Sequence, residues 1–417
     1  MSKDTEAINS QVTYDTTTQP GDVQAGELKD HESNYDAVFG EITEDGPNFR
    51  SMGWLGAIAL MLKTQIGLGV LSIPSVFDTL GIVPGSILLC VVAGIATWTS
   101  YMVGIFKLNH REVYGIDDAA GLMFDWVFNG GSGILSLSIG LNAVSKHAAC
   151  TAVFVVVSAI IGFAFTSIRT LSRITFLVWV GLACILTAVL TVTVAVGVQD
   201  GPSTAPQGWT SDYKLFNSPS FADGVSAVSG LIFVCSATPA YFSIFAEMQN
   251  PQLFTRALVI SQFTSTVVYL IVGVVVYYYC GSTVASPALG TAATTAIFLH
   301  YPSKYVFVRV LRGSVHLTSN SLIHWMTWLC CTGGCTIISY IIASGIPVFS
   351  DLVSLIGALL GFALAYQPTG CMWFYDNWRR TDRDWKWVAL ACWSGFTIVV
   401  GSFMTVAGTY GSIFFHY

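Results

Sequence analysis

Two apolar stretches of this 417-residue chain are interrupted by residues that break helices. The first, KTQIGLGVLSIP at residues 63–74, contains Gly67 and ends at Pro74. The second, CSATPAY at residues 235–241, carries Pro239, which removes one donor from the helical hydrogen-bond ladder. A helix that unwinds inside a membrane frees backbone N–H and C=O groups to hold a polar ligand. Both stretches therefore predict ligand binding by backbone groups, and an α-amino acid offers the two charges that such helix ends bind.

A plainer interpretation exists for both stretches, because Gly and Pro are common in membrane helices and small residues often only allow close packing. The spacing favours the functional interpretation. The two breaks lie five predicted crossings apart, and an odd offset inverts the second unit relative to the first. Two inverted five-helix units, each opening with a broken helix, are typical of inverted-repeat transporters, which hold substrate between the breaks.

Two charged residues lie beside the breaks. Lys63 either acts inside the membrane, in gating or coupling, or extends its long stem to the cytoplasmic face, and the residues leave both interpretations open. Glu247, at the inner end of the second broken helix, is predicted to cap that helix or to form a gating ion pair, with Arg256 as the candidate partner. The scattered residues His147, His300, His316 and His324 are expected to be structural.

The sequence has no arrangement typical of an enzyme. It lacks HExxH, GxSxG and P-loop motifs, and its ten cysteines lie mostly in apolar runs without CxxC pairs. It also lacks a basic patch with interleaved aromatic residues, which excludes nucleic acid as a partner. The sequence therefore predicts no catalytic residues, no bound metal and no cofactor.

The composition places these breaks in a membrane protein. Apolar residues make up 53% of the chain, charged residues 10% and mean hydropathy is +0.64, whereas soluble proteins carry about 25% charged residues. A spanning helix needs roughly 20 apolar residues. By this length, nine helices are clear, at about 52–75, 83–106, 148–168, 174–197, 223–247, 257–280, 321–346, 351–375 and 386–413. Two weaker segments, 119–143 and 285–310, bring the predicted all-α architecture to about eleven spanning helices.

Basic residues predict the orientation, because Lys and Arg accumulate in cytoplasmic loops. With a cytoplasmic amino terminus and eleven crossings, Lys146 and Lys214 are the two of the 18 basic residues that fall outside. Without the two weak helices, three fall outside. The distribution favours eleven crossings and a cytoplasmic amino terminus.

The amino-terminal segment differs from the rest of the chain. Residues 1–50 hold 11 of the 24 acidic residues, much of the net charge of −6, and are predicted to form a disordered cytoplasmic tail. Residues 51–417 form the predicted transporter domain, with repeats at about 52–197 and 223–375 and an extra helix at 386–413. Lys3 and Lys29, within a Ser/Thr-rich acidic context, suggest that ubiquitination or kinase machinery acts on the tail; an inert solvated tail is the alternative.

Four stretches together resemble the amino acid/auxin permease family, and particularly its fungal neutral amino acid permeases: KTQIGLGVLSIP (63–74), LNAVS (141–145), FVCSATPAYFSIFAEMQNP (233–251) and PSKYVFVR (302–309). The resemblance covers roughly residues 48–413. It implies a leucine-transporter-type fold of eleven helices and secondary active symport of a neutral, large or aromatic amino acid, driven by protons, with sodium not excluded. It places the substrate against Thr64, Gln65, Ile66, Gly67, Gly69, Ser236, Ala237 and Thr238, with Phe233 and Tyr241 as selectivity walls.

The two weak segments depart from the family pattern. The third helix lacks an aromatic lead-in between Phe124 and Gly130, and the eighth is clipped between Leu289 and Leu299. Eleven apolar residues at about 1.5 Å each reach only about half of the ~30 Å hydrocarbon layer, so each helix can cross only by drawing in polar neighbours. The alternative function is therefore an impaired or non-transporting paralogue that senses amino acids or binds a membrane partner. The expected location is the plasma membrane, with the vacuolar membrane as the alternative.

Overall fold

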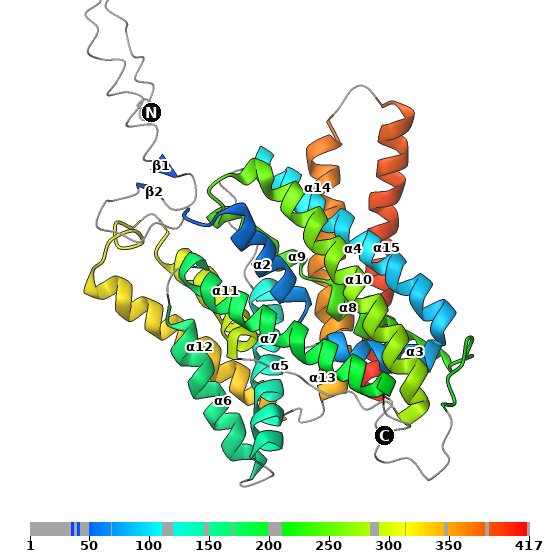
Figure 1. Cartoon of the computed structure of the whole chain (residues 1–417). Coiled ribbons are helices and arrows are strands. Elements are labelled where there is room, and N and C mark those ends of the chain that lie inside the picture. The colour runs from blue at the N-terminus through cyan, green and yellow to red at the C-terminus, as the bar shows by residue number, and fades with distance from the viewer. Residues whose placement is uncertain are drawn as a thin grey trace, which may run out of the picture.

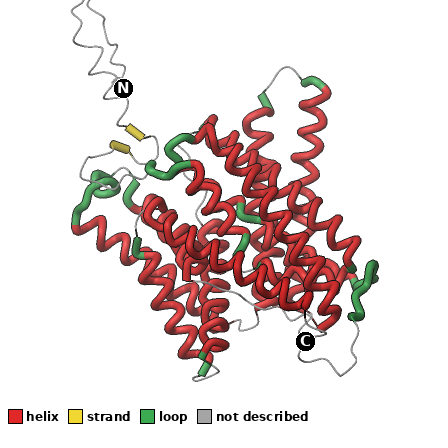
Figure 2. The backbone as a smooth tube through the Cα atoms, in the orientation of Figure 1, coloured by secondary structure: helices red, strands yellow, loops and turns green. Residues whose placement is uncertain are grey.

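The computed structural model describes residues 35–36, 40–41, 50–67, 69–110, 120–145, 150–168, 171–198, 211–283, 292–312, 314–345, 349–379 and 383–414. These residues are almost entirely helical (Figures 1 and 2). A two-residue antiparallel pair, β1 (Tyr35–Asp36) with β2 (Gly40–Glu41), is the strand structure of the described part. This pair lies within the tail predicted to be disordered, residues 1–50. Most of that tail, including Lys3 and Lys29, falls outside the described residues.

The helices follow the order expected from the sequence. The first half contains α2 (Trp54–Gln65), η1 (Val70–Ser72), α3 (Ile73–Leu80), α4 (Ile82–Asn109), α5 (Ala120–Val144), α6 (Thr151–Thr166) and α7 (Leu171–Val198). The second half contains α8 (Phe221–Cys235), α9 (Thr238–Glu247), η2 (Pro251–Leu253), α10 (Phe254–Cys280), η3 (Gly281–Thr283), α11 (Ala292–Val310), α12 (Leu322–Gly345), α13 (Phe349–Ile356), the π-helical segment η4 (Gly357–Tyr366) and α14 (Gln367–Asn377). The final helix is α15 (Trp385–Phe414).

The broken helices lie at the centre and the unbroken ones surround them. In the span Phe221–Glu247, which joins α8 and α9, 78% of the most apolar window is buried, against 17% for the span within α15. The outer helices expose large apolar side chains, such as Phe176 (77%) and Phe263 (71%), which suits contact with lipid. Seven helices of the described part are long and apolar enough to cross a bilayer, so the chain is an integral membrane protein of helical type. The exact number of crossings stays a prediction.

Both weak segments of the sequence form helices. α5 has 25 residues, and α11 has 19, which corresponds to about 29 Å at 1.5 Å per residue. α11 reaches this length by including His300, Ser303 and Lys304, and all three are buried against the rest of the protein. The polar neighbours that the short apolar run was expected to draw in are therefore turned inward.

Figure 1 shows how the chain ends are arranged. α2 begins on the same side of the molecule as the end of α14 and the start of α15, whereas α15 runs across the body and finishes on the opposite side. An odd number of crossings gives this arrangement.

Candidate functional site

The first broken helix unwinds after Gln65, where α2 ends. The N–H of Ile66 still donates to the carbonyl of Leu62 at 2.6 Å, but the N–H of Gly67 donates to the carbonyl of Gln65, only two residues back, at 2.8 Å. Ile66 has φ −75° and ψ 77°, the dihedral angles of an inverse γ-turn. The carbonyl of Lys63 therefore loses the N–H that would bind it in a continuous helix.

The second broken helix unwinds in the same way after Cys235. The N–H of Ser236 donates to the carbonyl of Ile232 at 2.8 Å, and the N–H of Ala237 donates to the carbonyl of Cys235 at 3.2 Å. Ser236 has φ −91° and ψ 73°, again close to an inverse γ-turn. Here the carbonyl of Phe233 loses its helical donor.

The two breaks contact each other. After each break the backbone returns to a helix with a proline in its first turn, where the missing N–H is tolerated. These prolines are Pro74 in α3 and Pro239 in α9. Between these turns Gly69 lies against Val234: a Cβ atom on Gly69 would overlap the Val234 Cγ2 atom and come within 3.3 Å of its Cβ atom. Short loop stretches accordingly lie inside the helical body (Figure 2). The predicted juxtaposition of the two stretches is present in the fold.

A buried amide network joins the first break to two neighbouring helices. The Gln65 Nε2 atom donates to the Tyr241 hydroxyl of α9 at 2.8 Å and to the Gln262 Oε1 atom of α10 at 2.7 Å. The Ser265 hydroxyl of α10 donates to the Gln65 Oε1 atom. The Gln65 side chain is thus occupied within the protein, so this residue and Tyr241 position the break through side-chain bonds. Gln262 and Ser265 were not predicted, although their three-residue spacing in an otherwise apolar stretch is a signal of one polar helix face.

Thr238 joins the second break to α4. Its hydroxyl lies 3.2 Å from the hydroxyls of both Thr99 and Ser100. Thr64 is buried as well, and its hydroxyl donates to the carbonyl of Leu60 in its own helix at 2.7 Å. These bonds and the amide network connect α2, α4, α9 and α10 as one packed unit, defined here as the bundle.

The hydroxyls of Ser236 and Tyr366 are buried near the second break, lie close to each other, and have no hydrogen-bond partner in good geometry. Tyr366 ends the π-helical segment η4, which packs against α8 and brings Gly361 next to the Ser236 side chain. Phe233 is half-buried at the same level. π-Helical turns occur often at functional sites, and unpaired buried hydroxyls are available to a bound ligand. The sequence did not identify Tyr366.

The inner end of the second broken helix carries a buried ion pair. The Lys304 Nζ atom of α11 binds the Glu247 Oε1 atom, and both side chains are 1% exposed. The prediction that Glu247 pairs with Arg256 was wrong, because the Arg256 guanidinium lies over the Trp54 ring, 5.1 Å from its centroid. Arg256 is nine residues from Glu247 in the chain, but the fold brings in Lys304 from a distant helix.

Lys63 is fully buried, and its Nζ atom has no hydrogen-bond partner in the structure. The amine therefore does not extend to the cytoplasmic face in this conformation. His300 is buried too, with its ring 5.3 Å from the Trp328 ring, and His324 binds the carbonyl of His316 at 2.8 Å. These contacts suit the structural roles expected of His300, His316 and His324, whereas His147 lies outside the described residues.

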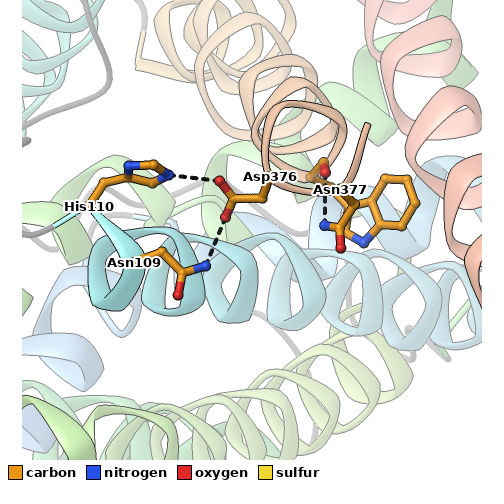
Figure 3. Close-up of polar contacts among 5 residues, drawn as sticks. Asn109, His110, Asp376 and Asn377 are labelled. Carbon is orange, nitrogen blue, oxygen red and sulfur yellow. Dashed lines mark hydrogen bonds and ion pairs between the residues drawn. The ribbon is translucent and has the colours of Figure 1, made fainter. Parts of the chain in front are cut away.

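A second polar contact closes the bundle against α14 (Figure 3). The His110 Nε2 atom, at the end of α4, lies 2.8 Å from the Asp376 Oδ1 atom, and the Asn109 Nδ2 atom donates to Asp376 Oδ2 at 3.0 Å. The His110 ring also lies 4.5 Å from the Phe106 ring and 5.6 Å from the Tyr375 ring. This cluster and the Glu247–Lys304 pair both join the bundle to helices outside it.

Two apolar grooves elsewhere do not resemble an amino acid site. One of 470 Å³ lies between α6 and α12, and one of 650 Å³ lies between α11 and α12. Their linings are almost wholly apolar and include exposed residues such as Ile160 and Met326. The paired breaks remain the candidate site.

Comparison with known proteins agrees with this geometry. The family model described as "Transmembrane amino acid transporter protein" matches residues 50–117 and 133–414. A "Transmembrane transporter" of Gibberella moniliformis is 30% identical, with 94% of this chain and 89% of the relative covered. An "N amino acid transport system protein" of Neurospora crassa is 28% identical, with 89% and 87% covered. Among solved structures, a Na⁺-coupled sialic acid symporter in a substrate-bound outward-open state matches with a TM-score of 0.52 at 15% identity, covering 89% of this chain and 93% of that one, so the folds are alike.

These matches span the membrane domain, including both breaks, and the relatives are transporters rather than enzymes. The chain therefore belongs to the transmembrane amino acid transporter family.

Proposed function

We propose that this protein is a secondary active transporter that carries a neutral amino acid, large or aromatic, together with a proton by alternating access. The observation that carries the proposal is the matching geometry of the two breaks. Each contains an inverse γ-turn that releases one carbonyl, at Lys63 and at Phe233, and the breaks touch at Gly69 and Val234.

The breaks offer complementary groups to an α-amino acid. Released carbonyls accept hydrogen bonds from the α-ammonium group, and the amino ends of α3 and α9 present the positive ends of helix dipoles to the carboxylate. The unpaired hydroxyls of Ser236 and Tyr366 and the half-buried Phe233 surround the second break. A large apolar side chain of the substrate would pack there. Ile66, Gly67, Ala237 and Thr238 contribute backbone at this level, as the family resemblance implies.

The bundle is suited to move as one body. Hydrogen bonds through Gln65 and Thr238 tie its helices together. The Glu247–Lys304 pair and the His110–Asp376 contact link it to α11 and α14. In our proposal these two contacts form the inner gate, and both break when the site opens to the cytoplasm.

The remaining assignments rest on sequence patterns. The proposed repeats are about 52–197 and 223–375, with the helix at 386–413 outside them, in a plasma membrane protein whose amino terminus is cytoplasmic. Ubiquitination or phosphorylation of the tail would regulate its residence there. The impaired, amino-acid-sensing paralogue was favoured by the two weak segments, and both form helices here. Binding without flux would still distinguish it.

Uptake of labelled leucine and phenylalanine tests the proposal in cells that lack their own permeases. Surface-expressed protein should give saturable uptake that rises at acidic pH and disappears in Gly67→Leu, whose side chain would fill the first break. Empty vector controls for background, and surface labelling controls for expression. Normal surface expression without uptake would contradict transport of these substrates, and binding of either one to the purified protein would then favour the sensing function.

A further inference from the structure

Three lysines of the described part are fully buried, and they differ in what surrounds the amine. Lys304 is paired with Glu247, and the Lys107 amine lies over the Phe245 ring at 5.9 Å. Lys63 has neither kind of contact, and its Nζ atom lacks a hydrogen-bond partner. It lies in the last turn of α2, at the residue whose carbonyl the first break releases.

No carboxylate is free to neutralise this amine on the helices packed against α2, which are α7, α9, α10 and α11. The sequences of α7, α10 and α11 contain no Asp or Glu, and the one in α9 is Glu247, which pairs with Lys304. The thiol of Cys184 also lies on α7. The other ionisable groups on these helices are Arg173, Tyr241, Arg256, Tyr269, Tyr277, Tyr278, Tyr279, Cys280, His300, Tyr301, Lys304, Tyr305 and Arg309.

An ammonium group enclosed without a counter-charge costs several kcal/mol, whereas a neutral amine in the same place does not. The enclosed position of Lys63 therefore favours the neutral amine. Movement of the bundle that admits water to the end of α2, from one side of the membrane and then from the other, would remove this penalty and let the amine exchange a proton with each side in turn. Coupling of a proton to transport requires a group whose protonation changes as the site opens to one side of the membrane and then to the other.

We propose that the Lys63 amine is the binding site for the proton that drives transport. This assignment rests on the proposed function and specifies the group that couples it. The proton binds the amine from the outside together with substrate, and the substrate carboxylate supplies the missing counter-charge while the break is closed around both. The proton leaves to the cytoplasm when the substrate does, so the charge of Lys63 alternates during the transport cycle.

Purified protein in liposomes tests the assignment with labelled leucine and phenylalanine. A gradient of about two pH units can drive about 100-fold accumulation when one proton moves with each substrate, because each unit is a factor of ten. We expect wild type to accumulate substrate toward this limit, and Lys63→Met to reach a ratio of about one while still exchanging labelled for unlabelled substrate. Lys107→Met is the control matched in burial and charge, and it should keep the wild-type ratio even if its rate falls.

The possible results separate the two proposals. Accumulation by Lys63→Met at the wild-type ratio would overturn the role of Lys63 while leaving proton coupling intact. Wild-type transport without any response to the gradient would instead contradict proton coupling itself. If Lys63→Met does not fold, calorimetry of leucine binding to wild type in two buffers of different ionisation enthalpy gives the answer. Net proton uptake or release is expected, and none at any pH would overturn the assignment.

Discussion

The two broken helices have nearly the same backbone and different side chains around it. Ile66 and Ser236 occupy equivalent positions, each at the centre of an inverse γ-turn. At the first break the nearby polar side chain, Gln65, is fully bonded inside the bundle. At the second, the Ser236 hydroxyl lies near the hydroxyl of Tyr366, which belongs to a π-helical segment, and neither has a partner in good hydrogen-bond geometry. The comparison suggests that the first break contributes shared backbone recognition and the second contributes selectivity.

The largest effect is expected where the two breaks touch. In Gly69→Ala the new methyl group would overlap Val234, and overpacking of this kind costs about 1–3 kcal/mol. Because the collision displaces the site itself, we expect leucine uptake to fall more than about tenfold. Gly94→Ala is the matched control, since a Cβ atom there has no neighbour within 4 Å.

A compensating change sharpens this prediction. Val234→Ala in the Gly69→Ala background removes the overlapping atoms and should recover part of the uptake, giving a positive coupling in a double-mutant cycle. Equal uptake by Gly69→Ala and wild type would show that the breaks do not need this close contact.

The second prediction concerns the bonded side chain of the first break. Gln65→Leu keeps a side chain of similar size but removes the hydrogen bonds that Gln65 makes with Tyr241, Gln262 and Ser265. Each such buried loss costs about 1–3 kcal/mol, so the variant should melt at a clearly lower temperature in detergent. Gln367→Leu removes the exposed bond to Ser402 and should melt like wild type. A normal melting temperature for Gln65→Leu would mean that this network does not hold the bundle together.

The structure also shows how far sequence reasoning extends. The breaks were predictable because Gly67, Gly69, Pro74 and Pro239 act on the local backbone. The helices α5 and α11 looked incomplete because hydropathy counts His300 and Lys304 against a membrane helix, although burial inside the protein satisfies such residues. Segment length and hydropathy do not indicate whether a polar side chain points into the protein or toward lipid.

Partners across the fold were the harder part. Lys304 lies 57 residues from Glu247 and Gln262 lies 197 residues from Gln65, so only the packing of α10 and α11 against the bundle brings them together. The position of Tyr366 depends on the π-helical segment, whose turns contain more residues than those of an α-helix. The spacing of apolar residues in the sequence does not reveal such a segment. Local breaks follow from residue type, whereas the groups that complete the site follow from topology.

The smallest effect is expected at the second break, where substrate rather than the protein would use the hydroxyls. Ser236→Ala and Tyr366→Phe each remove a buried hydroxyl without a partner in good hydrogen-bond geometry, so protein stability should change little. A hydroxyl that binds substrate contributes about 1 kcal/mol, so KM for leucine or phenylalanine should rise about fivefold in each variant. Ser158→Ala and Tyr340→Phe are the matched controls, because Ser158 also has an unpaired buried hydroxyl and Tyr340 lines an outer groove. If all four variants give the wild-type KM, selectivity does not come from these hydroxyls and the two breaks contribute through backbone alone; if only the first pair shifts KM, the division of roles between the breaks is established.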